Sequence, residues 1–265
     1  MKVLVIILCL VAILPMWFMA MGSLQNIQQL FFMPPRLIPL HPILDNYLWY
    51  LKRPILRWAS NSAIVIASAV TMQLCTAMMC GYAFAMYDFK GKRFLWLMLL
   101  VGVSIPAITT VIPRFIILRQ MMLTGTLWSV ILPSVFAPPQ LYLTRRFFES
   151  VPVSILDSAR IDGAGEMRIL FRIVGPLTKP IIATLGLFSA VGVMGDFMWQ
   201  LLQLQKENVM TLLIGVIRES VAAPGRPNPI GREMAGGFIL LVPLLVIFAV
   251  ASKHFTHALS GAVKE

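Results

Sequence analysis

Charged side chains that could do chemistry are concentrated in one interval of the chain, residues 149–180, with long uncharged runs on both sides. No nucleophile in the chain is paired with a base, as covalent catalysis requires. The three histidines and three cysteines lack the spacing of metal ligands. We therefore predict no catalytic residue and no metal site, and expect the interval to present its charges to water or to a partner. Its charged residues are Glu149, Asp157, Arg160, Asp162, Glu166, Arg168, Arg172 and Lys179.

The interval has the pattern of two short amphipathic helices joined by a tight turn. Ser150 is a typical N-cap residue, and Pro152 suits the first helical turn. The first helix should end near Asp162, because Gly163 can take a positive φ without a Cβ clash. A second helix should begin near Gly165 and end at the Gly-Pro pair 175–176. The apolar positions are Val153, Leu156 and Ala159 in the first helix, and Met167, Leu170, Phe171 and Val174 in the second.

Two interpretations of this helix-turn-helix follow from its physics, and the pattern favours neither. It could occupy a groove on a soluble partner protein, as amphipathic helices do. It could equally be a loop that lies on lipid headgroups.

The composition indicates an integral membrane protein. Only 12% of the residues are charged, against about 25% in soluble domains, and the mean hydropathy is +0.83. The net charge of +11 fits basic residues that flank membrane spans. Nucleic-acid binding is not expected, because no basic run is interleaved with aromatic residues.

We predict an all-α membrane protein with six transmembrane helices in a single domain over residues 1–265. The first apolar run could pass for a signal peptide, but an uncleaved span is favoured because more spans follow. Prolines interrupt the third and fourth runs, where they mark either bends along a pathway or static kinks. The predicted spans are residues 3–22, 60–87, 94–113, 127–144, 180–203 and 234–252.

Six spans place both termini on one side of the membrane. The turn at residues 88–93, DFKGKR, carries three positive charges and is therefore predicted to be cytoplasmic. The charged interval falls on the same side. We accordingly predict a multi-pass protein with both termini in the cytoplasm.

Two polar residues inside predicted spans are candidates for a substrate pathway. Asp196 is the one acidic residue of the fifth apolar stretch, and ionisable groups in spans usually face a cavity or a partner. Its distance from Lys179 places it near the outer interface, where a structural or inter-subunit role is the stronger alternative. Gln73 in the second span is a weaker candidate, with hydrogen bonding between helices as its alternative.

The charged interval resembles the EAA motif of ABC-importer membrane subunits, E-A-A-x3-G-x9-I-x-L-P. The spacing is kept throughout, but three positions depart: Asp157 replaces Glu, Ser158 replaces Ala and Gly175 replaces Leu. Nearly the whole chain is similar to sugar-type permeases, specifically the smaller partner of maltose-type importers. The supporting segments include NSAIVIASAV, YAFAMYDFKGKR, ARIDGA and VGVMGDFMW.

The resemblance implies that residues 149–176 form a cytoplasmic coupling loop, which sits in a cleft of an ATPase subunit. No phosphate-binding motif GxxxxGK[ST] occurs in the chain, so ATP and Mg would be bound by that other subunit, and this chain would hold no cofactor. The resemblance gives the coupling role to Asp157, Ser158, Ala159, Asp162, Gly163, Ile173 and Pro176.

The resemblance therefore implies a permease subunit in a bacterial inner membrane, not an enzyme. Its implied partners are a homologous second permease, two ATPase subunits, an external solute-binding protein and the bilayer. Its substrate would be a sugar, oligosaccharide or polyol, with glycerol phosphate open. The alternative is a secondary transporter driven by an ion gradient, which would favour an internal repeat and ion ligands near the midplane. Neither is apparent in the sequence.

Overall fold

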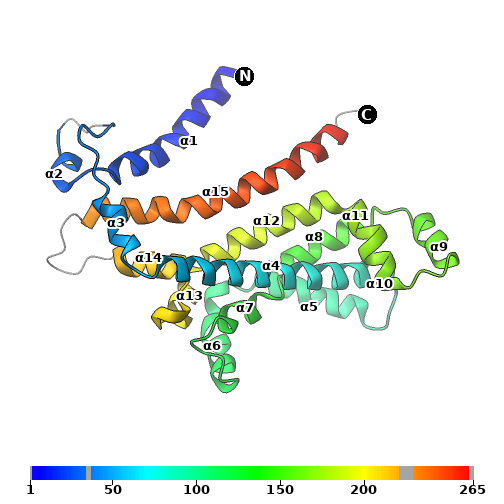
Figure 1. The fold of residues 1–265 in the computed structure, drawn as a ribbon. Helices are drawn as coiled ribbons and strands as arrows, with labels where there is room; N and C mark the ends of the chain where they lie inside the picture. The colour runs from blue at the N-terminus through cyan, green and yellow to red at the C-terminus, as the bar shows by residue number, and fades with distance from the viewer. Residues whose placement is uncertain (1, 34–36, 221–228, 263–265) are drawn as a thin grey trace. The chain divides into compact units, whose positions relative to one another are not determined.

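The computed structural model describes the backbone of residues 2–33, 37–220 and 229–262, and within these ranges every regular element is a helix (Figure 1). The predicted all-α fold is confirmed for this part of the chain. The chain folds into two compact units, Met1–Ser62 with Leu204–Val246, and Ala63–Gln203 with Ile247–Glu265.

The first unit is formed by two segments that are far apart in the sequence. Its elements are α1 (Lys2–Gly22), α2 (Ile27–Leu30), α3 (Asp45–Leu51), the first residues of α4 (Ile55–Met86), the 3-10 helix η3 (Glu207–Val209), α14 (Leu212–Ser220) and most of α15 (Pro229–Ala262).

The start of α4 organises the core of this unit. The side-chain amide of Asn61 donates to the carbonyls of Asn208 and Met210 at 3.1 and 2.8 Å. The hydroxyl of Ser62 accepts the Leu212 N–H at 2.8 Å. The Ser62 bond satisfies the first N–H of α14, where a helix has no acceptor of its own, and the Asn61 bonds hold the segment that leads into it. One turn further on, Gly215 packs directly against the indole of Trp58.

The second unit holds the remaining elements. These are the rest of α4, α5 (Lys92–Ser104), the 3-10 helix η1 (Ala107–Thr110), α6 (Val111–Gln120), α7 (Trp128–Ser134), α8 (Pro138–Phe148), α9 (Val153–Ile161), α10 (Glu166–Ile169), the π-helical turn η2 (Leu170–Val174), α11 (Gly175–Leu177), α12 (Lys179–Gly195), α13 (Phe197–Gln203) and the end of α15.

Helix α8 packs against α4, α5 and α12 in this unit. Gly81 of α4 allows the closest approach, because a Cβ there would lie 2.8 Å from the Thr144 methyl group. Small residues at such a crossing let two backbones approach closely, as in membrane helix pairs.

Among the described residues, three helices are long and apolar enough to cross a membrane: Val3–Gly22, Ile55–Met86 and Ile230–Ala249. Two further pairs pass the same test together but are sharply bent. They are Lys92–Ser104 with Ala107–Gln120, bent by 103°, and Glu166–Leu177 with Lys179–Gly195, bent by 88°. The described chain therefore has three candidate spans, or five if each bent pair counts as one.

The predicted third, fourth and fifth spans are not single helices. Helix α5 ends at Ser104, since Ile105 is extended ahead of Pro106, as residues before proline usually are. Residues 127–144 are divided between α7 and α8, with an extended Ala137 ahead of two prolines that start α8. The fifth predicted span breaks at Asp196, between α12 and α13.

Candidate coupling loop

The loop of residues 149–176 contains two helices separated by a glycine turn. Helix α9 is followed by Asp162, and the chain reverses at Gly163, whose φ is +77°. Helix α10 then begins at Glu166 after Gly165. The positive φ is the conformation for which we expected a glycine. A Cβ built on Gly163 meets no atom within 4 Å, so the chain leaves the surface above this glycine open.

The start of α9 differs from the prediction. Ser150 does not cap this helix, because its hydroxyl donates to the Phe147 carbonyl at 2.7 Å. Pro152 is the residue that precedes the helix, with φ −59° and ψ 128°, and Val153 is the first helical residue. The serine therefore satisfies a carbonyl at the end of α8, where helices lack internal donors.

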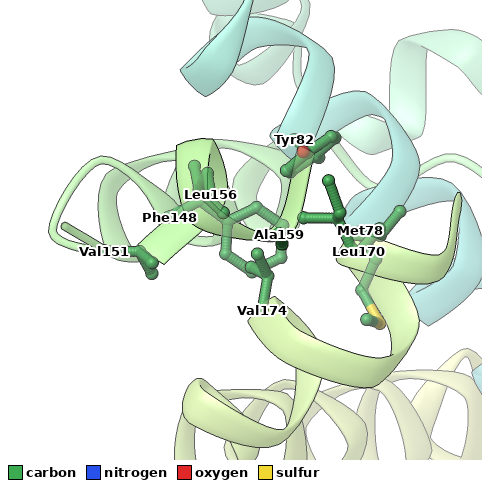
Figure 2. Close-up of a cluster of buried hydrophobic side chains, with 9 residues drawn as sticks. Met78, Tyr82, Phe148, Val151, Leu156, Ala159, Leu170 and Val174 are labelled. Carbon is green, nitrogen blue, oxygen red and sulfur yellow. The ribbon is translucent and has the colours of Figure 1, made fainter. Parts of the chain in front are cut away.

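The loop packs against α4 and the end of α8 within the second unit through a cluster of buried apolar side chains, here called the loop cluster (Figure 2). Helix α9 contributes Leu156 and Ala159, whereas α4 contributes Met78 and Tyr82. Burial of such side chains is worth about 1.5–3 kcal/mol each, so the cluster fixes the loop to α4. The complete cluster is Met78, Tyr82, Phe148, Val151, Leu156, Ala159, Ile169, Leu170 and Val174.

The apolar stripe predicted for the second helix is half wrong. Leu170 and Val174 are buried, but Met167 and Phe171 are 55% and 42% exposed. Ile169 is buried instead. Residues 170–174 form a π turn, in which hydrogen bonds run from residue i to i+5, so the spacing of an α-helix does not carry across it.

The Gly-Pro pair at 175–176 does not end the helical path as predicted. The chain continues through α11 to Leu177 and bends at Thr178 before α12. Proline cannot donate a backbone hydrogen bond, and a π turn directly before Pro176 is one of the ways in which a helix accommodates an irregularity. Thr178 is buried, and its hydroxyl donates to the Val174 carbonyl at 2.8 Å.

A polar network joins the two loop helices to α4. The Glu166 carboxylate accepts one hydrogen bond from the Tyr82 hydroxyl at 2.6 Å and another from Arg160 Nε at 2.9 Å. Arg160 also donates to Asp157 at 3.2 Å. The hydrogen bond from Arg160 holds the pKa of the Glu166 carboxyl well below its usual range. We call Tyr82, Asp157, Arg160 and Glu166 the Glu166 network.

The residues assigned to coupling divide into two sets. Ala159 is buried in the loop cluster, and Ile173 is half-buried against it. The others are exposed: Asp157, Ser158, Asp162, Gly163 and Pro176. The sequence interpretation did not single out Tyr82, Arg160 or Glu166. The opposite charges of Arg160 and Glu166, on either side of the glycine turn, were the one sequence feature that could have indicated an ion pair there.

The two pathway candidates lie apart from the loop cluster. The Gln73 side chain is buried and accepts a hydrogen bond from Gln140 Nε2 at 3.0 Å, and the same nitrogen donates to the Ser189 hydroxyl at 2.6 Å. This cluster links α4, α8 and α12, and the sequence interpretation missed two of its three members. Asp196 is exposed at the break between α12 and α13.

Residues 73–261 match the family described as binding-protein-dependent transport system inner membrane component. The match covers more than half of the chain and includes the whole of α9 to α12. The chain belongs to this family. It is therefore a membrane component of a transport system and not an enzyme, and proteins of this family work with a solute-binding protein and an ATPase.

Two curated relatives belong to oligosaccharide transport systems. The arabinooligosaccharides transport system permease protein AraQ of Halalkalibacterium halodurans is 31% identical over 224 residues, which are 83% of this chain and 79% of the relative. The diacetylchitobiose uptake system permease protein NgcG of Streptomyces coelicolor is 27% identical over 267 residues, covering 99% and 86%.

A solved structure shares the fold. It is a chain of a bacterial ABC transporter involved in the import of the acidic polysaccharide alginate. The two chains superpose with a TM-score of 0.83 at 21% identity, over 96% of this chain and 94% of the other. The fold described above is thus shared with a chain of this transporter.

Proposed function

We propose that the chain is the permease subunit of an ATP-driven, binding-protein-dependent importer for an oligosaccharide or related sugar. The family match over residues 73–261 carries this proposal. The names of the relatives, which include arabinooligosaccharide and diacetylchitobiose systems, support the substrate class. The partners would be a homologous second permease, two ATPase subunits that bind ATP and Mg, and an external binding protein.

In this proposal the chain crosses the membrane six times, with both termini in the cytoplasm. The crossings would be α1, α4, α5 with α6, α7 with α8, α12 with α13, and α15. Of the two bent pairs, Lys92–Ser104 with Ala107–Gln120 would form one crossing, whereas in the other pair only α12 would cross and Glu166–Leu177 would lie in the loop. Irregular backbone within a crossing is tolerated where protein buries it or a water-filled cavity lies beside it.

The loop of residues 149–176 would transmit movement of the ATPase to the membrane helices. Its exposed residues Asp157, Ser158, Asp162, Gly163 and Pro176 would contact the ATPase, and Ala159 and Ile173 would hold the loop cluster together. The Glu166 network supports this role, because it ties both loop helices to α4. ATP-driven closure of the ATPases would then reach α4 and α12 together.

For the pathway we propose distinct roles for the two candidates. Gln73 would position α4, α8 and α12 through Gln140 and Ser189, because its amide is buried and hydrogen-bonded. Asp196 is exposed at a helix end and would contact the solute or a neighbouring subunit.

Uptake into proteoliposomes tests the function. The assembled transporter, loaded with ATP inside and supplied with binding protein and labelled arabino- or chito-oligosaccharides outside, should accumulate at least one of them. Accumulation driven by an ion gradient without ATP would instead support a secondary transporter. Accumulation of glycerol phosphate alone would overturn the substrate class and leave the ATP-driven mechanism intact.

A further inference from the structure

A cationic cavity lies at the turn between α4 and α5. Its volume is about 720 Å³, and it is a shallow pocket that opens broadly onto the surface. Basic side chains come from two segments, with Lys92 and Arg93 at the start of α5 and Arg145 on α8. The lining also includes the carboxylate of Asp88 and the rings of Phe94 and Trp96.

The positive charges of this cavity are only partly neutralised. Lys92 Nζ bonds Asp88 at 2.9 Å, and Arg145 Nε bonds Glu149 at 2.8 Å. Arg145 also lies 4.0 Å from the centroid of the Trp96 ring. Arg93 forms no ion pair within the described residues. The lining therefore has three cations and one carboxylate, and the guanidinium of Arg93 is free to bind an anion.

The start of α5 adds to this imbalance. Lys92 and Arg93 occupy the first turn of a 13-residue helix that has no acidic residue in that turn. The N-terminal end of a helix carries a partial positive charge, so cations there are unfavourable and anions are stabilised. A bound anion would offset both the excess of cations in the cavity and the partial positive charge at the start of α5.

The cavity lies where a membrane surface is expected. It is beside residues 87–91, which connect the candidate span α4 to the first half of a bent candidate span. Trp96 and Phe94 flank it, as aromatic residues do at membrane interfaces. Leu97, which also lines the cavity, and Val101, one turn further along α5, are exposed and apolar.

We propose that this cavity binds the phosphate headgroup of an anionic phospholipid. Arg93 and the remaining donors of Arg145 and Lys92 would bind the phosphate oxygens. The acyl chains would lie along the exposed apolar residues of α5. Basic pockets at the ends of membrane helices bind anionic headgroups by this combination of charge and apolar contact. The site is independent of the transported solute.

Native mass spectrometry of the assembled transporter in detergent tests the site. The probes are phosphatidylglycerol and phosphatidylcholine, added separately, and the readout is the dissociation constant of the first lipid adduct. The anionic lipid should bind at least about fivefold more tightly, the factor that corresponds to about 1 kcal/mol for one cation near a membrane surface. Equal binding of the two lipids would overturn the proposal.

Two variants, Arg93→Gln and Lys90→Gln, each remove one positive charge and together test where the lipid binds. Arg93→Gln should weaken phosphatidylglycerol binding about fivefold, whereas Arg93→Lys should keep most of it. Lys90→Gln is the matched control, because Lys90 lies in the same turn and is exposed but does not line the cavity. Equal losses in Arg93→Gln and Lys90→Gln would show diffuse attraction to the membrane surface and contradict a defined site.

Competition by inorganic phosphate separates the two possible sources of the anion. A lipid site should retain phosphatidylglycerol in excess phosphate, because the acyl chains add apolar contact that free phosphate lacks. Displacement of the lipid by phosphate would overturn the lipid proposal. This measurement and the comparison of lipids use the unmodified transporter, so they decide the question even if Arg93→Gln fails to assemble.

Discussion

At the scale of single residues, Glu166 is the point where the two loop helices and α4 meet. Its carboxylate accepts hydrogen bonds from Tyr82 on α4 and Arg160 on α9. Charged hydrogen bonds are stronger than neutral ones, and here one group receives two of them from different elements. Loss of this carboxylate should therefore remove the polar connection between α4, α9 and α10. The apolar contacts of the loop cluster would remain.

Single and double replacements of Tyr82 and Glu166 measure how much this hydrogen bond contributes to transport. Tyr82→Phe and Glu166→Gln should each lower ATP-driven uptake about fivefold, equivalent to about 1 kcal/mol. The double variant should be little worse than Glu166→Gln alone, because the Tyr82–Glu166 bond that Tyr82→Phe removes is already weakened when the carboxylate loses its charge. Tyr142→Phe removes a phenol hydroxyl outside the network and should leave uptake unchanged. Additive losses would contradict a shared role.

The same carboxylate predicts a dependence on pH. Its pKa is lowered in the folded protein by the Arg160 hydrogen bond, so its stabilising effect is complete above the ordinary glutamate pKa of about 4.3 and is lost as the pH falls through the lowered value. The difference in melting temperature between the unmodified chain and Glu166→Gln should be constant from about pH 8 to 5 and shrink below about pH 4. A difference that already fades near pH 6 would contradict this assignment.

Variants of Gly163 test whether this glycine is needed for its backbone conformation or for the bare surface over it. Its positive φ disfavours any side chain with a Cβ, by about 1–2 kcal/mol for alanine, although space around it is open in this chain. Gly163→Ala should reduce co-purification of the ATPase, while Gly165→Ala, at an ordinary φ of −69°, should not.

Gly163→Asn separates the two causes, since asparagine tolerates this conformation. If asparagine restores ATPase binding, the glycine is needed for the turn alone. If asparagine also fails while the chain remains folded, the bare surface over Gly163 is itself part of the docking site. Normal ATPase binding in all three variants would remove Gly163 from the coupling role.

At the scale of elements, the sequence predicted helices well and their interruptions poorly. The turn at Gly163 and the end of α9 near Asp162 were predictable, because both depend on the local preferences of a few residues. The π turn and the exposure of Met167 were not, because they depend on how the chain passes Pro176 and packs on α4. The Gln73 partners Gln140 and Ser189 come from distant helices, which periodicity cannot bring together.

Packing of α14 against α4 gives a prediction at this scale. Gly215 is in direct contact with the Trp58 indole, so Gly215→Ala should overpack the core of the first unit and lower its stability by about 1–3 kcal/mol. Gly192 lies on α12 with no atom within 4 Å of an added Cβ. Gly192→Ala should therefore unfold at the parent's temperature or slightly above it, because alanine favours a helix over glycine by about 0.5–1 kcal/mol. Equal melting temperatures for the two variants would contradict the packing described.

At the scale of the whole molecule, hydropathy fixes the class of protein but not the path of each crossing. Single apolar helices in the described chain account for three candidate spans, and bent pairs for two more. A bent pair has the hydropathy of a straight helix, so its angle cannot be obtained from composition. The number and direction of crossings therefore need a topological measurement.

Reporter fusions provide it. Green fluorescent protein attached to either terminus should fluoresce, because that protein does not mature when exported unfolded, and alkaline phosphatase at the same positions should be inactive. Alkaline phosphatase inserted at residues 205–211, which the six-span arrangement places outside between the fifth and sixth crossings, should be active. Opposite results at the two termini would mean an odd number of crossings and would contradict the six-span arrangement.

The right-angle bend at Thr178 has a mechanical consequence. Helices α10 to α11 and helix α12 meet there at 88°, and the buried Thr178 hydroxyl donates to the Val174 carbonyl at the end of the first arm. Because α10 to α11 and α12 are joined at a right angle, rotation about Thr178 would turn a displacement of the first arm into a sideways movement of the far end of α12. The 17 residues of α12 make an arm of about 25 Å. A rotation of about 10° at Thr178 would move its far end by about 4 Å, a distance comparable with the width of a sugar ring.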